Sequence, residues 1–185
     1  MSAKEFRSLE NVDLPLGPLT VLVGPNGSGK TNVLNVLRFL ASTVRFDLAA
    51  AVDEWGGFDY VKRQGEGSPR AHVKLEIEGI VTNNASRTAL DEYKLSFSLT
   101  ARNRLRREES FTFKRTQGQG RRITIKGSKV EFSKDDPHDS SPLTRELADA
   151  QRTGLATLPD WSDEDGGEGI RLLADFLSRR LSFQN

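Results

Sequence analysis

The residue types from Gly24 to Thr31 are suited to binding the phosphates of a nucleotide. The segment reads Gly-Pro-Asn-Gly-Ser-Gly-Lys-Thr. Its three glycines allow backbone conformations in which successive N–H groups turn toward an anion. Lys30 would place a positive charge on the β- and γ-phosphates, and the hydroxyl of Thr31 would be one ligand of Mg²⁺. The spacing therefore predicts a site for a nucleoside triphosphate with Mg²⁺.

Two elements must position this loop. Strand-forming residues precede it at Leu19–Val23, and a helical pattern follows from Thr31 to Leu40. The N-terminus of that helix would add unsatisfied N–H donors and the positive end of its dipole. A glycine-rich loop can occur by chance, but a strand before it and a helix after it rarely occur by chance as well. Lys30 is the predicted catalytic residue, and the predicted nucleotide contacts here are Gly24, Pro25, Asn26, Gly27, Ser28, Gly29, Lys30, Thr31 and Asn32.

The rest of the chain changes from helical to alternating patterns. Short strands are expected at Glu5–Leu9 and Val12–Leu16, and a second helix from about Arg45 to Glu54. Residues 71–133 then alternate apolar and polar side chains between turn residues, which predicts an antiparallel meander. Helices are expected at Leu143–Arg152 and Ile170–Leu181. The pattern divides one lobe into a nucleotide-binding core at 1–70, the β subdomain at 71–133 and a helical segment at 134–185.

Composition indicates an ordinary globular protein. The 185 residues include 27 basic and 26 acidic side chains, so no overall field favours a polyanion partner. Cysteine is absent, which excludes disulfides and cysteine-based metal sites. No apolar run reaches the length of a membrane span, and the first ten residues are charged where a signal peptide would be apolar. We therefore expect a cytoplasmic protein without a membrane partner.

The chain resembles a known family over Phe6 to Leu40. The resemblance rests on Phe6-Arg7-Ser8-Leu9, the phosphate loop with its flanking residues, and the later Gly56-Gly57-Phe58. These segments are similar to the N-terminal half of ABC-type ATPases of the RecF, SMC and OLD-like "AAA family ATPase" group. The resemblance implies an α/β fold, a P-loop NTPase N-terminal lobe with an antiparallel β-meander subdomain. It also implies ATP and Mg²⁺ as cofactors, and a head that dimerises around ATP or joins a complementary half.

The resemblance also assigns residues outside the loop. It places Phe6, Arg7 and Ser8 near adenine, although Phe6 could equally be a core residue of its strand. It suggests Gln64 as the glutamine that senses Mg²⁺, with an exposed loop amide as the alternative. Among the two histidines, His72 and His138, no metal site is expected.

Two hydrolytic elements of such ATPases are not evident in the sequence. A Walker B strand should end in Asp-Glu, but Asp175 lies in a helical pattern and precedes Phe176. Gly166-Gly167-Glu168 lacks the serine of the family's signature turn and reads as a plain loop. We therefore expect an N-terminal fragment or half-protein, which needs further sequence or a partner chain for hydrolysis.

Basic residues crowd the region from Arg102 to Lys129. In this family they would give salt-sensitive contacts to DNA phosphates. The alternative is that they protect sheet edges from aggregation. The patch comprises Arg102, Arg104, Arg106, Arg107, Lys114, Arg115, Arg121, Arg122, Lys126 and Lys129.

Two functions remain open at the sequence level. The first is an ATP-binding lobe of an ATPase with a DNA repair or phage-defence role, in which Lys30 and Thr31 act on phosphate and Mg²⁺. The second is a nucleotide-binding assembly module without turnover. A small-molecule kinase is a weaker third alternative, because such kinases follow the loop with α/β crossovers and an antiparallel meander follows here.

Overall fold

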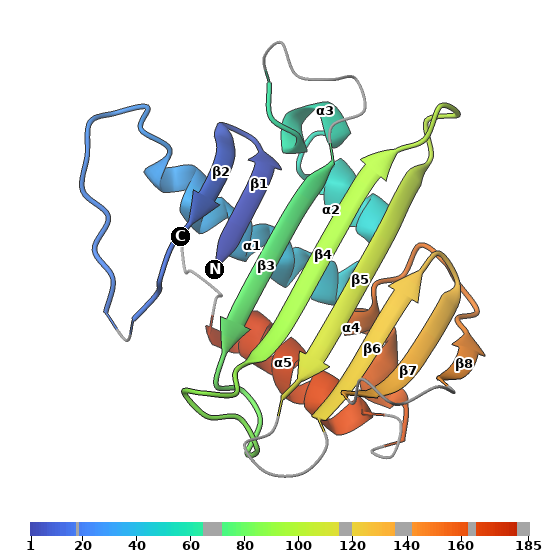
Figure 1. The fold of residues 1–185 in the computed structure, drawn as a ribbon. Helices are drawn as coiled ribbons and strands as arrows, with labels where there is room; N and C mark the ends of the chain where they lie inside the picture. The colour runs from blue at the N-terminus through green and yellow to red at the C-terminus, as the bar shows by residue number, and fades with distance from the viewer. Residues whose placement is uncertain (18, 65–71, 115–119, 136–141, 163–165, 181–185) are drawn as a thin grey trace.

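A single antiparallel sheet of eight strands organises the computed structural model, which describes residues 1–17, 19–64, 72–114, 120–135, 142–162 and 166–180. The strand order is β2-β1-β3-β4-β5-β6-β7-β8, so each strand from β3 onward neighbours the next in sequence. Strands from the N-terminal core, the meander and the C-terminal segment thus share one sheet (Figure 1). The strands are β1 Ser2–Phe6, β2 Leu9–Asp13, β3 Val73–Gly79, β4 Asp91–Leu99, β5 Leu105–Phe113, β6 Gly120–Lys126, β7 Lys129–Asp135 and β8 Leu143–Glu146.

The helices cover one face of this sheet. In Figure 1 the long helices α1 and α5, with α2 and α4, lie behind the strands. Asp47 caps α2 by accepting a hydrogen bond from the Ala50 N–H at 2.7 Å, which separates α2 from α1. Gly57 closes α2 by donating to the Val52 carbonyl at 2.9 Å. The helices are α1 Lys30–Arg45, α2 Leu48–Glu54, α3 Phe58–Val61, α4 Gly154–Thr157, the 3₁₀ turn η1 Leu158–Asp160 and α5 Gly167–Arg180.

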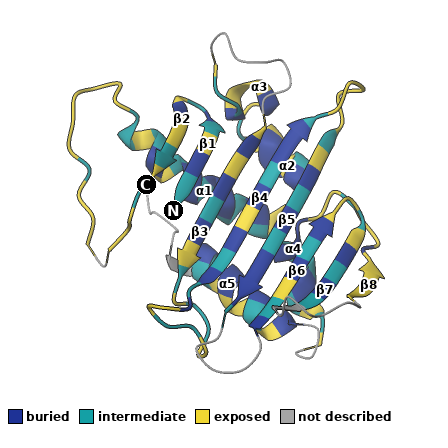
Figure 2. Ribbon diagram, viewed as in Figure 1, coloured by how far each residue is buried: buried dark blue, intermediate teal, exposed yellow. Residues whose placement is uncertain are grey.

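Alternating side chains give the sheet a core face and an open face. On β3, Val73, Leu75 and Ile77 are buried while Lys74 and Glu78 are exposed. The same alternation runs along β4, β5 and β6, and Figure 2 shows it as alternating colours along the strands. The helices therefore bury the apolar face, and β3 to β7 are consecutive antiparallel strands within one eight-stranded sheet.

Three sequence expectations about local structure were wrong. Glu5–Leu9 is not one strand, because β1 ends at Phe6 and β2 begins at Leu9. Leu19–Val23 forms no strand and pairs with no strand that the structure describes, and the side chains of Leu19, Val21 and Val23 are 85%, 72% and 89% exposed. Strand-forming residues alone cannot make a strand without a neighbour to accept the backbone hydrogen bonds. Leu143–Arg152 is no helix: Leu143–Glu146 forms β8 on the outer side of β7, because pairing overrides helix propensity.

The core face also carries one buried ion pair. The side chains of Arg107 and Glu109 on β5 are 2% and 0% exposed, and they form an ion pair with each other. Glu109 also accepts hydrogen bonds from the Tyr93 hydroxyl at 2.9 Å and from the Gly154 N–H at 2.9 Å. A guanidinium nitrogen of Arg107 donates to the carbonyl of Ala150 at 3.0 Å. These bonds hold the segment before α4 against the sheet, and we call this group the Glu109 cluster.

Burial of this cluster has an electrostatic consequence. Desolvation raises the pKa of Tyr93 well above its usual value, and the neighbouring negative charge of Glu109 raises it further. The Tyr93 hydroxyl therefore stays protonated and remains a donor to Glu109. Arg107, counted at the sequence level with the basic patch, belongs to the core instead.

Candidate functional site: a phosphate loop at the start of α1

The loop from Gly24 to Lys30 leads directly into α1 and folds around the lysine ammonium. Lys30 Nζ donates to the carbonyl oxygens of Gly24 at 2.7 Å and Pro25 at 2.6 Å, and lies 3.2 Å from the hydroxyl oxygen of Ser28. The Ser28 N–H closes a turn on the Pro25 carbonyl at 3.3 Å. The lysine therefore projects back into the loop that it follows, where a bound phosphate would meet its charge.

The N-terminus of α1 offers donors without an internal acceptor. No side chain caps this end, and its first turn contains no acidic residue. The first N–H groups of a helix have no intrahelical partner and carry the positive end of the dipole. Thr31, in that first turn, is exposed. Free donors, one ammonium and one accessible hydroxyl fit a ligand that carries phosphates and Mg²⁺.

Glycine is required at position 29 for two reasons. Gly29 has φ 90°, which is in the left-handed region that side chains disfavour. A Cβ there would lie 3.2 Å from Leu9 Cδ2 and 3.5 Å from Ser8 Oγ. The turn between β1 and β2 thus lies against the end of the phosphate loop. Asn32 fastens this contact by donating from Nδ2 to Ser8 Oγ at 2.7 Å, while its own oxygen accepts from Asn35 at 3.2 Å.

The three residues that the resemblance assigned to adenine separate into two groups. Phe6 is fully buried, with its ring centroid 5.8 Å from that of Phe39, so it is a core residue. Arg7 is half-buried and Ser8 is exposed, and both lie in the turn beside the loop. The Arg7 guanidinium lies over the ring of Trp55, with its central carbon 5.7 Å from the ring centroid. Sequence reasoning missed Trp55, because nothing in its neighbourhood links it to a residue 48 positions earlier.

Other predicted site residues lie apart from the loop. Gln64 is exposed, and among the described residues no hydrogen bond joins it to the loop. Asp175 is exposed inside α5, as expected for a helix surface charge rather than a Walker B residue. A Cβ at Gly167 would lie 2.2 Å from the Trp161 carbonyl oxygen. Packing of the start of α5 therefore explains the glycine there, and no signature turn is needed to account for it.

The basic patch does not form one surface. Arg107 is buried, and Arg106, Lys114 and Lys129 each pair with a carboxylate. Arg102 and Arg104 lie at the turn between β4 and β5, and Arg115 lies outside the described residues.

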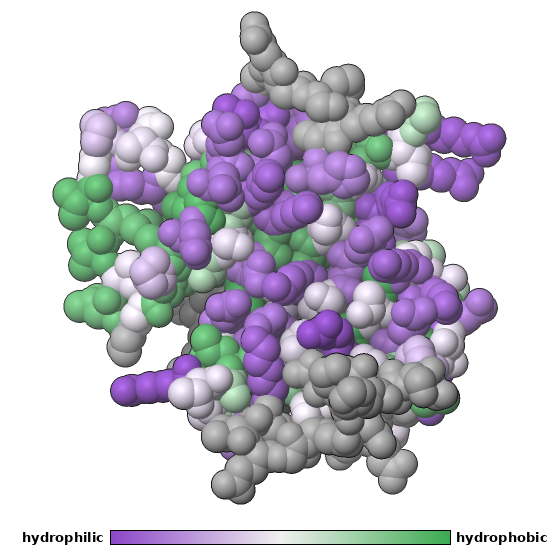
Figure 3. Space-filling view, viewed as in Figure 1, coloured by the Kyte–Doolittle hydropathy of each residue, from purple (hydrophilic) through white to green (hydrophobic). Residues whose placement is uncertain are grey.

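A different basic feature crosses the open face of the sheet. The strand registers place Lys4 opposite Lys74, and Lys126 opposite Lys129, in one row that also includes Ser96 and Glu108. Like charges directly opposite each other destabilise a sheet. Figure 3 shows this face covered by hydrophilic side chains. The row from Lys4 to Lys129, here called the lysine row, therefore holds two like-charged pairs, and it continues to Glu146 opposite Lys129, which also pairs with Glu131 at 2.6 Å.

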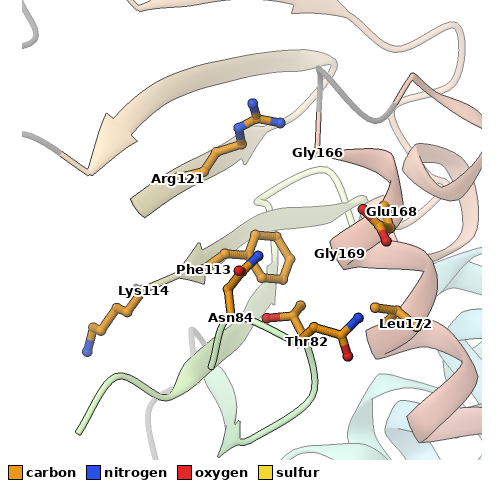
Figure 4. A pocket seen from close by; sticks show the side chains of 10 residues that line it. Thr82, Asn84, Phe113, Lys114, Arg121, Gly166, Glu168, Gly169 and Leu172 are labelled. Atoms are coloured by element: carbon orange, nitrogen blue, oxygen red, sulfur yellow. The ribbon is translucent and has the colours of Figure 1, made fainter. Parts of the chain in front are cut away.

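A small cavity of about 110 Å³ lies where the start of α5 meets the sheet (Figure 4). Phe113 and Gly169 line it, together with Arg121 and the loop residues Thr82 and Asn84. Glu168 contributes a negative charge to this cavity, and Lys114 at its rim bonds to Glu92 instead. No residue of the phosphate loop lines it. The cavity is separate from the loop between Gly24 and Lys30.

Family comparison agrees with the loop geometry. Residues 19–162 match the family described as "AAA domain, putative AbiEii toxin, Type IV TA system". The chain belongs to this AAA domain family. The matched residues begin just before the phosphate loop and end before α5, so they include most of the sheet.

Curated relatives match mainly around the loop. The chain is 52% identical over 44 residues to an OLD nuclease from Thermus scotoductus, which is 24% of this chain and 8% of that protein. It is 54% identical over 43 residues to the DNA replication and repair protein RecF of Paenarthrobacter aurescens, which is 23% of this chain and 11% of that protein. A longer match, 32% over 99 residues, joins it to RecF of Beutenbergia cavernae and covers 52% of this chain and 25% of that protein.

Around the loop, the AAA domain is therefore similar to proteins of the RecF and OLD group. The matches span a quarter or less of each of these three relatives. No solved structure matches the chain. Within the described part of the chain, no helix has the length and apolar character needed to cross a bilayer.

Proposed function

We propose that this chain is the ATP-binding lobe of an ABC-type ATPase head, with ATP and Mg²⁺ bound at the phosphate loop. Lys30 would neutralise the β- and γ-phosphates, and Thr31 would contribute its hydroxyl to Mg²⁺. Arg7 and Ser8 would face the nucleoside, while Asn32 would hold their turn against the loop. The main support for this proposal is that Lys30 Nζ donates hydrogen bonds to the Gly24 and Pro25 carbonyls of the loop, at the N-terminus of α1, which no side chain caps.

Hydrolysis would depend on a complementary element. Bound Mg²⁺ and a positioned carboxylate normally complete phosphoryl transfer to water. Among the described residues, no Asp or Glu hydrogen-bonds to any residue from Gly24 to Thr31. The exposed apolar side chains of Leu19, Val21 and Val23 belong to the segment that leads into this loop. Figure 3 shows hydrophobic surface at the left, where Figure 1 draws the chain between β2 and α1. A further strand, from a complementary half or from a second head in an ATP-dependent dimer, would cover these side chains and bring that carboxylate.

The central test is calorimetric titration with Mg²⁺-ATP, with phosphate release followed in the same samples. Lys30→Ala should weaken ATP binding by about 100-fold or more, because a charged hydrogen bond contributes about 1.5–3 kcal/mol and this lysine would make several. Lys62→Ala is the matched control, because Lys62 pairs with Asp59 in α3, outside the loop. Equal ATP affinity of Lys30→Ala and the native chain would contradict the proposal.

The same titration separates turnover from binding alone. Binding without phosphate release would support a lobe that awaits its complementary half, and also the alternative of a non-hydrolysing assembly module. Adding the complementary half then distinguishes these two: release on mixing supports the ATPase, and continued absence of release supports the module. Steady release by this chain alone would contradict the need for a complementary element.

A DNA-associated role, in repair or phage defence, is the second part of the proposal. It is supported by the like-charged pairs of the lysine row rather than by the dispersed basic patch. Lysines in a row across a sheet can contact successive phosphates without reading bases. Of these residues, Lys126 and Lys129 belong to the patch expected from sequence, whereas Lys4 and Lys74 do not.

Salt dependence tests this second part. Binding to duplex DNA, followed by fluorescence anisotropy between 50 and 200 mM salt, should weaken in Lys74→Ala/Lys126→Ala. Loss of two phosphate contacts should reduce the slope of log affinity against log salt by about 1.8. Arg102→Ala/Arg104→Ala removes the same charge from the β4–β5 turn and is the control. Equal losses in both double variants would indicate a diffuse charge effect and contradict a role for the lysine row.

A further inference from the structure

The turn between β1 and β2 holds Arg7 at the edge of the phosphate loop. Arg7 has φ 52°, an uncommon value for a residue with a Cβ, and its N–H donates to the Val61 carbonyl at 2.9 Å. The next residue, Ser8, accepts the bond from Asn32, which immediately follows Thr31. The backbone of Arg7 is thus fastened on one side to the end of α3 and on the other to the start of α1.

The side chain of Arg7 has an aromatic support. Its guanidinium lies over the half-buried ring of Trp55, and among the described residues it makes no ion pair or side-chain hydrogen bond. Trp55 is itself held by two core rings, with centroid distances of 5.8 Å to Phe39 and 6.4 Å to Phe6. Phe39 belongs to α1, the helix that the phosphate loop opens. Arg7 is therefore connected through Trp55 and Phe39 to α1, the helix whose N-terminus would bind phosphate.

We propose that Trp55 is a positioning residue, which holds the Arg7 guanidinium as a stacking surface for the nucleobase of the bound nucleotide. A planar guanidinium that stacks on an aromatic ring can present its other face to a second flat ring, as arginine does when it stacks on bases. The inference rests on the proposed function, since the loop must first bind the phosphates. It adds that base affinity depends on Trp55, a residue that itself need not touch the ligand.

This arrangement has a specific consequence for ligand choice. Inorganic tripolyphosphate can use the phosphate loop but has no base to stack on Arg7. ATP should therefore bind more tightly than tripolyphosphate, and loss of the Arg7 support should reduce this preference by about five- to tenfold. The affinity for tripolyphosphate itself should stay the same, because the loop and Lys30 are unchanged.

The experiment compares the two ligands by calorimetry in the presence of Mg²⁺. Trp55→Leu removes the aromatic support, and Trp55→Phe restores a ring as the conservative variant. Trp55→Leu should reduce the preference for ATP about five- to tenfold, Trp55→Phe should keep most of it, and Arg7→Ala should match Trp55→Leu. The double variant Arg7→Ala/Trp55→Leu should lose no more than either single variant, because both changes remove the same stacking surface.

Fluorescence gives a readout independent of affinity. The chain has two tryptophans, so Trp161→Phe leaves Trp55 as the single emitter. ATP should change the emission of Trp55 in this variant, and tripolyphosphate should change it much less. Adding Arg7→Ala should remove the ATP-specific change. Because this variant keeps Trp55 and its contacts with Phe6 and Phe39, the measurement remains informative even where Trp55→Leu fails to fold.

The outcomes are distinguishable. Equal loss of affinity for ATP and tripolyphosphate in Trp55→Leu would overturn the positioning role, because it would mean a general loosening of α1. An unchanged preference in both Arg7→Ala and Trp55→Leu would overturn the stacking surface while leaving the loop's role intact. Failure of the native chain to bind either ligand would contradict the proposed function itself, and the inference with it.

Discussion

The Glu109 cluster and the segment from Leu19 to Thr31 differ in how their groups are satisfied. Around Glu109, a charged pair, a hydroxyl and a backbone N–H find partners within the chain, and nearly all of their surface is buried. In the other segment, apolar side chains are 72% to 89% exposed and the helix N-terminus has no cap. The first region satisfies most of its polar groups within the chain, with Arg107 Nε as a buried nitrogen that has no hydrogen-bond partner among the described residues, whereas the second region offers unused contacts.

This difference indicates that the Glu109 cluster stabilises the fold, whereas the segment from Leu19 to Thr31 is available for a ligand or partner. Burying charge without compensation is costly, so the Glu109 cluster persists only because its members bond to one another. Backbone donors that remain exposed can hydrogen-bond to water, so they carry little desolvation cost. Such donors can bind a phosphate, and exposed apolar side chains can pack against another strand. Substitutions in the two regions should therefore change different measurements.

The largest effect on folding should come from the Glu109 cluster. Glu109→Ala leaves the buried Arg107 charge uncompensated and removes acceptors from Tyr93 and Gly154. We expect a loss of about 3–5 kcal/mol in the free energy of unfolding, measured by chemical denaturation. Glu108→Ala is the control, because Glu108 lies on the same strand but in an exposed pair with Arg106, and should change stability by about 0.5 kcal/mol. Similar values for the two variants would contradict a self-completed cluster.

A smaller loss of stability is expected from a substitution within the phosphate loop. Gly29→Ala places a Cβ in the left-handed region and 3.2 Å from Leu9. The backbone alone should cost about 1–2 kcal/mol, and ATP affinity should fall as the loop shifts. Gly127→Ala is the matched control, since Gly127 has φ 61° with no atom within 4 Å of an added Cβ. An equal cost at both positions would mean that the contact with Leu9 contributes nothing.

A third prediction concerns pH and the open face of the sheet. Burial raises the pKa of Glu92, but bonds and charge from Lys114 and Lys94 outweigh burial, so its pKa is lowered from 4.5. A carboxyl with a lowered pKa in the folded state stabilises the fold above the unfolded pKa, and this stabilisation is lost as pH falls through the folded value.

Glu92→Gln should therefore cost about 0.5–1 kcal/mol in unfolding free energy at pH 7, and less as pH falls below 4.5. Denaturant melts at pH 7 and pH 3 would measure this difference. Glu146→Gln, at an exposed position of β8, is the control. A cost for Glu92→Gln that is constant with pH would contradict the ionic origin.

The smallest effect on stability should come from the exposed segment. Leu19→Ser/Val21→Ser changes side chains that remain largely in water, so the free energy of unfolding of this chain should change by about 0.5 kcal/mol or less. Val36→Ala, at a fully buried position of α1, should cost about 2 kcal/mol in the same denaturant melts. A comparable loss in the double variant would show that Leu19 and Val21 pack within the chain and would remove the contrast between the two regions.

Local patterns were sufficient to predict much of the fold. Alternation along β3 to β7 identified the meander, and the spacing from Gly24 to Thr31 identified the phosphate loop. These features depend on side-chain period and backbone freedom, which neighbouring residues determine. The same reasoning failed for Leu19–Val23 and for Leu143–Glu146, because whether a segment becomes a strand depends on a partner distant in sequence.

Residue types and spacing alone specify the chemistry available to this protein: a lysine, a threonine and three glycines with the spacing of a phosphate loop, and strands with alternating apolar side chains. Which of these groups come into contact depends on the folded chain. Folding buries Arg107 against Glu109, brings the turn at Ser8 to Gly29, and places Trp55 beneath Arg7. The physical reason is that composition and spacing act over a few residues, whereas burial, pairing and ring contacts join residues tens of positions apart.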